Sequence, residues 1–316
     1  MTSFLGGLNS LYSRFLNKRV KHLQVKLPYP EAVFPLIDLG VNFFDEAFAD
    51  DLDDVLERAQ LAGVTGMLLT GTDLTLSEKS LNLAHQYPHL LCSTAGVHPH
   101  QASEWTQTTA ASLQALLAEP ACVAVGETGL DFNRNFSTPA DQQKAFEAQL
   151  GLAVETGKPL FIHERDAGVK MLEMLSAWRD SISGAVVHCF TGEKKTLFGY
   201  LDLDLYIGIT GWVCDERRGT HLWPLLPSIP QNRLMIETDS PWLLPRNLKP
   251  RPKKYRNEPA YLPWVLQQVA DLYQLPVEEV AEFTSRNAQQ LFNLPAELLL
   301  PKERLKELSD KPRENK

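Results

Sequence analysis

Eight short apolar segments recur along the chain from residue 34 onward, each bounded by glycine, proline or polar residues. Bounded apolar runs of this length are typical of strands that are buried on both faces. Their starts are spaced by roughly 20 to 35 residues, the length of one strand plus one helix. The predicted strands are 35–42, 66–72, 90–98, 123–131, 159–165, 184–190, 205–213 and 234–241.

Helical patterns occupy the intervals between these segments. Before the fifth one, Thr138 is placed as an N-cap, Pro139 stands at the first helical position, and Gly157 closes the pattern. A last amphipathic stretch covers 278–294. Alternating strands and helices imply a parallel sheet, and eight such units over roughly 200 to 250 residues predict a closed (β/α)₈ TIM barrel. An open doubly wound sheet is the alternative, weakened because no GxGxxG follows the first segment.

This predicted barrel domain spans residues 34–295, and no internal linker divides it. Ahead of it, residues 1–33 form a basic extension, in which the first 30 residues contain no acid. Behind it, residues 296–316 form a charged tail. No apolar run approaches the roughly 18 residues of a membrane span, so we expect no membrane partner.

Composition narrows the class of protein. The chain has 316 residues, 44% hydrophobic and 22% charged, as in soluble globular proteins. Four widely spaced cysteines form no CxxC pair and indicate reduced thiols in the cytoplasm. A net charge of −8 argues against a surface coated in positive charge for duplex binding, although a local basic cleft stays open. The basic stretch 247–257 is the candidate for that cleft, with a solvated loop as the alternative.

Polar residues stand where the predicted strands end, which is where a (β/α)₈ barrel carries its catalytic groups. They are His98, Glu127, His163, His188 and Asp239. A lone histidine on an apolar strand is usually a core residue, but a buried carboxylate must be paired, protonated or bound to metal. Together they predict a divalent site for Mg²⁺, Mn²⁺ or Zn²⁺. A metal that activates water and a carboxylate that takes its proton indicate hydrolysis, with the bond left open.

Several longer motifs then point to a family. The stretches "STAGVHPH", "VGETGLDFNRNFST", "FIHERDA", "HCFTG", "YIGITGWVCDERRG" and "LMIETDSPWLLPR" resemble those of the TatD family of metal-dependent deoxyribonucleases, over roughly residues 35 to 295. The resemblance implies a TIM barrel with Mg²⁺-dependent 3′–5′ exonuclease activity on single-stranded DNA and RNA. It also implies a cytoplasmic, monomeric protein that serves repair of oxidative DNA damage.

The same resemblance assigns roles to individual residues. The family's metal ligands fall on Glu127, His163, His188 and Asp239. Asp239 is also our candidate for the proton acceptor. The histidine of "GVHP" is His98, which we assign to the scissile phosphate or the leaving group.

The first predicted strand departs from the pattern of many members. Where they carry His-x-His, this chain has Gly40 and Asn42, and neither replaces an imidazole as a ligand. We therefore expect one firmly held ion rather than a tight two-metal site. Asn42 is predicted to contact the substrate or to hydrogen-bond to a metal-binding side chain, and not to bind the metal itself. Asp38 is left between a structural hydrogen bond and a weak metal contact.

Candidate substrate contacts lie around this centre. Arg165 suits a phosphate oxygen, with a salt bridge to Asp166 as the alternative. Trp212 and Phe132 are candidates for stacking on bases, although core packing is the preferred interpretation of both. The candidates for contact with the phosphates of the nucleic-acid backbone are 217–218 and the basic residues of 249–256.

Two other classes of function stay open. One is a metal-dependent amidohydrolase that cleaves C–N or ester bonds with a similar barrel and similar ligands. The other is a non-catalytic nucleic-acid-binding protein. The retained acids and imidazoles argue against the second, because a binding protein does not need them buried together.

Overall fold

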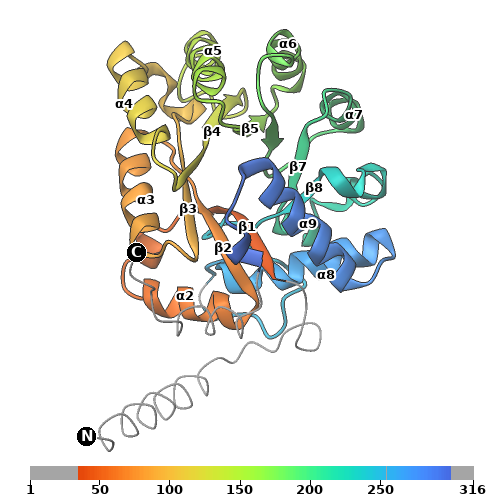
Figure 1. Cartoon of the computed structure of the whole chain (residues 1–316). Helices are drawn as coiled ribbons and strands as arrows, with labels where there is room; N and C mark the ends of the chain where they lie inside the picture. Colours follow the sequence, from red (N-terminus) through yellow and green to blue (C-terminus); the bar gives the residue numbers. More distant parts are fainter. Residues whose placement is uncertain (1–34, 254, 300–316) are drawn as a thin grey trace, which may run out of the picture.

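The computed structural model describes residues 35–253 and 255–299, which form a single eight-stranded parallel barrel with helices outside it (Figure 1). Each predicted strand segment overlaps one observed strand, and the predicted (β/α)₈ architecture is confirmed. The strands are β1 Leu36–Val41, β2 Val64–Leu69, β3 Leu91–Ala95, β4 Cys122–Asp131, β5 Leu160–Arg165, β6 Ala185–Val187, β7 Tyr206–Ile209 and β8 Leu234–Ile236.

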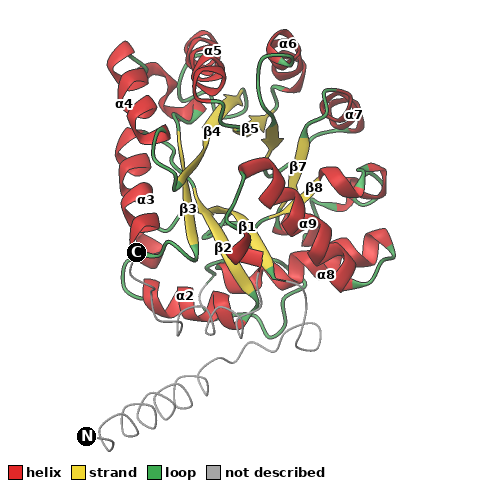
Figure 2. Cartoon of the chain, viewed as in Figure 1, coloured by secondary structure: helices red, strands yellow, loops and turns green. Residues whose placement is uncertain are grey.

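Helices cover the outside of the barrel and alternate with the strands (Figure 2). The predicted caps of α5 are observed: the Thr138 side chain accepts a hydrogen bond from the Asp141 amide, and Gly157 ends the helix at φ 68°. The α-helices are α2 Leu52–Leu61, α3 Leu74–Gln86, α4 Gln107–Leu117, α5 Pro139–Thr156, α6 Gly168–Trp178, α7 Lys194–Asp202, α8 Leu262–Tyr273 and α9 Val277–Phe292. Short 3₁₀ helices are η1 Glu46–Phe48, η2 Pro99–Glu104, η3 Gly211–Cys214, η4 Thr220–Leu222, η5 Leu226–Ser228, η6 Gln231–Arg233, η7 Pro259–Tyr261 and η8 Ala296–Leu299.

The barrel closes at a seam between β8 and β1. The strands pair in sequence order, and the seam itself carries a parallel bridge between Val41 and Ser240. Asp38 reinforces the seam: its carboxylate accepts hydrogen bonds from the Thr238 amide at 2.8 Å and the Thr238 hydroxyl at 2.6 Å. Side chains therefore hold together the two strands that lie farthest apart along the sequence.

The N-terminal ends of the strands form the floor of the barrel, which α9 and η8 cover. Ile37, Leu68 and Phe161 inside the barrel pack in one buried cluster with Leu298 of η8. The Thr65 hydroxyl also donates to the carbonyl oxygens of Leu36 and Leu298. The packed domain thus extends past the predicted boundary at residue 295. The predicted extension 1–33 and residues 300–316 of the tail lie outside the described residues.

Two further observations bear on the class of protein. None of the described helices combines the length and the apolar character that crossing a membrane requires. The four cysteines are all free thiols, as the sequence predicted.

Candidate active site

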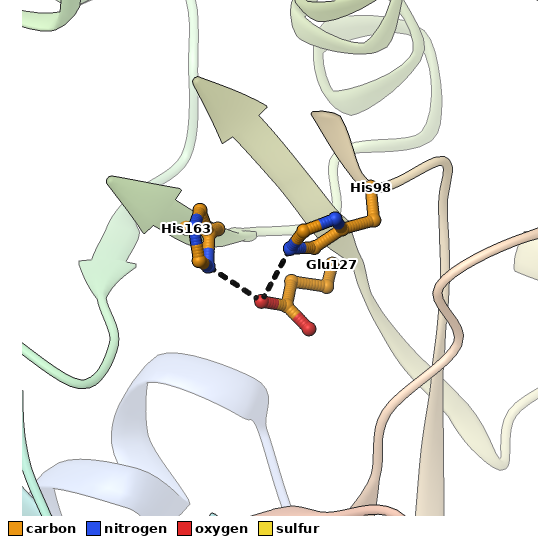
Figure 3. A group of neighbouring side chains, drawn as sticks. All are labelled: His98, Glu127 and His163. Carbon is orange, nitrogen blue, oxygen red and sulfur yellow. Dashed lines mark hydrogen bonds and ion pairs between the residues drawn. The ribbon is translucent and has the colours of Figure 1, made fainter. Parts of the chain in front are cut away.

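The C-terminal ends of the parallel strands meet at one mouth of the barrel, and four predicted site residues meet there. Glu127 lies on β4 and His163 on β5, while His188 follows β6 directly and His98 follows β3 by three residues. Figure 3 shows the imidazoles of His98 and His163 directed at the Glu127 carboxylate. Ligand atoms of His98, Glu127 and His163 all lie within 4.8 Å of one another.

One carboxylate oxygen organises this cluster. Glu127 Oε1 lies 2.8 Å from His188 Nε2, 3.0 Å from His163 Nδ1 and 3.4 Å from His98 Nε2. Burial alone would raise the pKa of Glu127, but the His188 and His98 imidazoles more than offset burial and hold this pKa well below its usual range. Glu127 is therefore ionised although only 7% of it is exposed.

The histidines respond to the same contacts in opposite directions. Burial lowers the pKa of His98 to about 4, more than Glu127 raises it. His188 is also buried, yet contacts with Glu127 and Glu237 hold its pKa well above the usual value. Burial thus keeps His98 neutral, so its ring offers one N–H donor and one lone pair, whereas the flanking carboxylates favour a proton on His188 that a bound cation would replace.

Glu237 contacts the Nδ1 side of the His188 ring, opposite the nitrogen that faces Glu127. The sequence did not predict this role. Its Oε2 lies 3.4 Å from His188 Nδ1, and its Oε1 accepts a hydrogen bond from the Cys189 amide. The space it occupies depends on Gly40, since a Cβ there would lie 2.8 Å from Glu237 Oε2. Gly40 of β1 thus contributes to the site by leaving room for a carboxylate.

A second unpredicted pair lies on the other side of His163. The Asp131 carboxylate contacts His100 Nε2 at 2.7 Å and lies 3.6 Å from His163 Nε2. Burial opposes these contacts but does not outweigh them, so the pKa of Asp131 is low. A signal was present in the sequence, because Asp131 ends the same strand as Glu127 and His100 stands two residues after His98.

The structure places Asp239 next to Asn42 across the barrel seam. Asn42 Nδ2 donates to Asp239 Oδ1 at 3.3 Å and to the Ser240 carbonyl at 3.2 Å. Burial raises the pKa of Asp239 to about 8, and the Glu127 and Glu237 carboxylates add to that rise. Among the described residues His98, rather than Asp239, joins Glu127 and His163 within ligand distance.

Asp38 belongs to the seam rather than to the cluster. It is fully buried and accepts its hydrogen bonds from Thr238 and, at 3.4 Å, from the Gly40 amide. Burial raises its pKa to about 7, although the hydrogen bonds from Thr238 act in the opposite direction. Of the two roles left open by the sequence, these contacts favour the structural hydrogen bond.

Arg165 and Trp212 are engaged with each other. The Arg165 guanidinium lies 5.5 Å from the centre of the Trp212 ring and donates to Thr191 Oγ1 at 3.2 Å, while Asp166 is 3.9 Å away. Arg218 lies over the same ring at 4.4 Å. Trp212 and Phe132 are both partly buried and pack against the core, in line with the preferred interpretation of both.

The candidate phosphate contacts divide into paired and unpaired cations. Arg217 and Arg218 each form an ion pair with Asp215, and Arg256 forms one with Asp51. In the same loop, Lys249, Arg251 and Lys253 are exposed, and no ion pair involving them occurs within the described residues. The unpaired group is the better suited to phosphates.

The cluster fits a divalent cation on three observations. Its donors are carboxylate oxygens and imidazole nitrogens, the set that suits zinc, manganese and related ions. His163 turns Nδ1 toward Glu127 Oε1 at 3.0 Å and Nε2 toward Asp131 at 3.6 Å, so the ring presents one nitrogen to the cluster and the other to an outer carboxylate. Asp239, Glu127 and Glu237 place three carboxylates together, and a bound positive charge would relieve their repulsion.

Comparison with known proteins gives a consistent result. The family model described as TatD related DNase matches residues 37–293. The 3′-5′ ssDNA/RNA exonuclease TatD of Edwardsiella piscicida is 52% identical over 259 residues, which cover 82% of this chain and 100% of that protein. The protein of the same name from Salmonella typhimurium is 52% identical over 259 residues, or 82% of this chain and 99% of that one.

Solved structures extend the likeness to the fold. YJJV, a TatD homolog from Escherichia coli K12, superposes with a TM-score of 0.75 at 27% identity and covers 82% of this chain and 98% of its own. A phosphotriesterase homology protein from Escherichia coli superposes at 0.58 with 15% identity, over 84% of this chain and all of that one. The latter similarity concerns the barrel alone.

Proposed function

The chain belongs to the TatD-related DNase family, and from that premise we propose that it is a metal-dependent 3′–5′ exonuclease of single-stranded DNA and RNA. The reaction is hydrolysis of phosphodiester bonds. One observation carries the proposal on the structural side: a buried, ionised Glu127 contacts three imidazoles at the mouth of the barrel. Relatives that share half of the sequence and bear this activity in their name support the substrate class.

We assign the cation to Glu127, His163 and His188, with His98 beside them and Asp239 at the edge of the cluster. Mg²⁺ is the proposed ion, and Mn²⁺ and Zn²⁺ suit the same donors. When bound, such an ion polarises a phosphoryl oxygen and lowers the pKa of bound water. Asp131 and Glu237 hold the ring orientations of His163 and His188 from the far side, as outer carboxylates do in metal sites.

The remaining steps belong to residues of the chain. Asp239 takes the proton of the attacking water, and the Asn42 amide orients its carboxylate through the 3.3 Å contact. His98 donates toward the scissile phosphate or the leaving oxygen. Arg165 contacts a nonbridging oxygen with its guanidinium, which is held in place by Thr191 and Trp212. The predicted monomeric state, cytoplasmic location and role in repair of oxidative damage stay predictions.

A direct assay tests this function. The purified protein is incubated with 3′-labelled single-stranded DNA or RNA in Mg²⁺, and a parallel sample contains EDTA. We expect stepwise release of labelled mononucleotides that EDTA abolishes and Mg²⁺ restores. Acyl and amide substrates in the same buffer test the amidohydrolase alternative. No nucleotide release with Mg²⁺, Mn²⁺ or Zn²⁺ would overturn the proposal.

A further inference from the structure

Exposed aromatic side chains gather at one end of the molecule. Isolated exposed apolar residues are normal on a protein surface and need no explanation, so their distribution is what matters. Four of the five exposed aromatics among the described residues lie on loops that follow the C-terminal ends of strands, and the fifth lies on the outer helix α7. The four are Phe44, Phe136, Trp242 and Tyr255, and the fifth is Phe198.

Phe136 is held next to the cluster although its ring is open to solvent. It lies on the loop between β4 and α5 and is 66% exposed. Its ring packs edge-to-face on His100, with centroids 4.7 Å apart, and His100 packs in turn on His98 at 4.2 Å. Because His100 is also hydrogen-bonded to Asp131, the Phe136 ring has a fixed support while most of the residue stays open to solvent.

Trp242 occupies the opposite side of the mouth. It follows Asp239 by three residues, and its amide donates to the Asp239 carbonyl at 3.0 Å. Trp242 is 52% exposed. In an eight-stranded barrel with strands in sequence order, β8 is four strands from β4. The two aromatic residues therefore stand on opposite sides of the mouth.

Charge distinguishes these two sides. Residues 242–256 contain six lysines and arginines and no acid. Of these, Lys249, Arg251 and Lys253 are exposed and lack an ion pair within the described residues. On the β4 side, by contrast, Arg134 and Arg165 are offset by Asp131 at the end of β4 and Asp166 after β5, so this side has no comparable excess of positive charge. A chain of many phosphates is thus favoured on the β8 side, and the β4 side suits a single terminal nucleotide.

We propose that Phe136 stacks on the 3′-terminal base and Trp242 on the base that precedes it, with the upstream strand running over Lys249, Arg251 and Lys253. This inference rests on the proposed exonuclease function and deepens it. Stacking accepts every base, because each has a π face. It also selects single strands, because the faces of bases inside a duplex are already covered by their neighbours.

Matched variants and matched oligonucleotides test the assignment. The variants are Phe136→Ala, Phe136→Trp, Trp242→Ala and Trp242→Phe, with Phe198→Ala as the control for loss of an exposed aromatic. Affinity is measured in EDTA by fluorescence anisotropy of a labelled oligonucleotide, where no turnover occurs. Each alanine variant at the mouth should weaken Kd about 10-fold, within the range for loss of one stacked base. The aromatic replacements and Phe198→Ala should bind as the wild type does.

An oligonucleotide with an abasic 3′-terminal residue assigns the positions. The wild type should bind it about 10-fold more weakly than the full oligonucleotide, and Phe136→Ala should add no further loss. Trp242→Ala should still weaken binding of this 3′-abasic oligonucleotide. On an oligonucleotide that lacks the preceding base instead, Trp242→Ala should cause no further loss of affinity. Since Phe136 is mostly exposed, its replacement should leave thermal unfolding unchanged.

The outcomes separate this inference from the function on which it rests. A wild type that releases no nucleotide from any oligonucleotide overturns both. A wild type that is active, together with a Phe136→Ala variant that binds as tightly as Phe198→Ala, overturns the inference alone. So does a Phe136→Ala variant that loses equal affinity for the full and the abasic oligonucleotide, because the lost contact would then lie away from the terminal base.

Discussion

The two ends of the barrel differ in the way they hold charge. The floor carries a cavity of about 890 Å³, lined in part by Lys158, Arg179, Asp204 and Arg233. There each cation has a partner: Arg179 and Arg233 both reach Asp204, and Lys158 donates to a backbone carbonyl. The mouth instead gathers carboxylates and imidazoles that compete for the same contacts, such as the three rings around Glu127.

This difference shows why the volume of a cavity is a poor guide to chemistry. The thiols next to the floor cavity are inert, since burial raises the pKa of Cys92 to about 11. At the mouth, burial and neighbouring charge move the pKa of Asp239 to about 8 and that of His98 to about 4. A pKa displaced by burial together with neighbouring charge marks a group that can exchange protons or bind metal, whereas burial among apolar neighbours only keeps a thiol protonated. Five experiments test whether function follows this division.

The largest effect is expected from His163→Ala, which removes a side chain that contacts both Glu127 and Asp131. Because a bound metal supplies several kcal/mol of charge stabilisation, turnover should fall by about 1,000-fold or more. Release of nucleotides from a 3′-labelled strand measures this, and circular dichroism checks the fold. A rate within a few-fold of the wild type would remove His163 from the metal centre.

Asp38→Asn should change the pH dependence of stability. In the folded protein Asp38 has a pKa of about 7, whereas the usual value is 3.8. Between these values the unfolded chain therefore binds fewer protons at Asp38 than the folded chain does, so the contribution of Asp38 to wild-type stability falls as the pH rises from about 4 to 7. Asparagine cannot ionise, so the difference in unfolding free energy between the two proteins should change by up to about 4 kcal/mol across that range. Urea unfolding at several pH values measures it.

A difference between Asp38→Asn and the wild type that stays constant from about pH 4 to 7 would contradict the buried, proton-holding role of Asp38 in the seam. Nucleotide release by Asp38→Asn also compares the barrel seam with the imidazole cluster. Since Asp38 contacts Thr238 rather than the imidazoles, we expect nucleotide release to fall less than it does in His163→Ala.

Gly40→Ala tests the space behind His188. The new Cβ would meet Glu237 Oε2 at 2.8 Å, which displaces the carboxylate that supports His188. We expect metal affinity and turnover to fall by about 10- to 100-fold. Gly151→Ala is a matched control, since its Cβ would meet nothing within 4 Å in the middle of α5, and alanine there should stabilise the helix by about 0.5 to 1 kcal/mol. Equal activities of the two variants would refute this role of Gly40.

Asn42→Ala should reduce turnover by about 10-fold, as expected for loss of an orienting hydrogen bond next to the reacting groups. The amide holds Asp239 but is not itself a strong ligand, so the affinity for Mg²⁺ should change less than the rate. Metal titration followed by nucleotide release separates the two quantities. If the loss equals that of His163→Ala, β1 contributes a ligand after all.

The smallest effect is expected at the floor. Arg233→Gln breaks the ion pair with Asp204 and the contact with the Tyr206 ring. Partly exposed pairs of this kind contribute about 0 to 1 kcal/mol, so Tm should drop slightly and turnover should stay at the wild-type level. A loss of nucleotide release comparable to that of the mouth variants would show that the two ends are coupled.

Hydrophobic periodicity predicted the strands, and the position of polar residues at strand ends predicted which side chains lie together. All eight strands follow from short apolar runs, and the grouping of Glu127, His163 and His188 follows because a parallel barrel brings strand ends together. What failed were contacts between side chains on different loops. The sequence favours core packing for Trp212 over base stacking, but it cannot show that Arg165 and Arg218 lie over the ring.

The unassigned role of Glu237 has a related cause. The residue was visible at the end of β8, but its function depends on a missing atom at Gly40, two hundred residues away in the chain. Similarly, the structural role of Asp38 depends on Thr238. Both pairs join β1 to the end of β8, a contact that follows from closure of the barrel and not from any local pattern.

The shared contacts of Thr65 also bear on how the chain could be reconnected. One hydroxyl reaches the carbonyl oxygens of both Leu36 and Leu298, so the first strand and the last short helix of the described barrel meet at the floor. A circular permutant could join residue 299 to residue 36 by a short linker and open new ends in the exposed turn at Asp180 and Ser181. Every loop of the mouth would keep its connections. The barrel and its mouth therefore do not depend on which strand comes first in the chain.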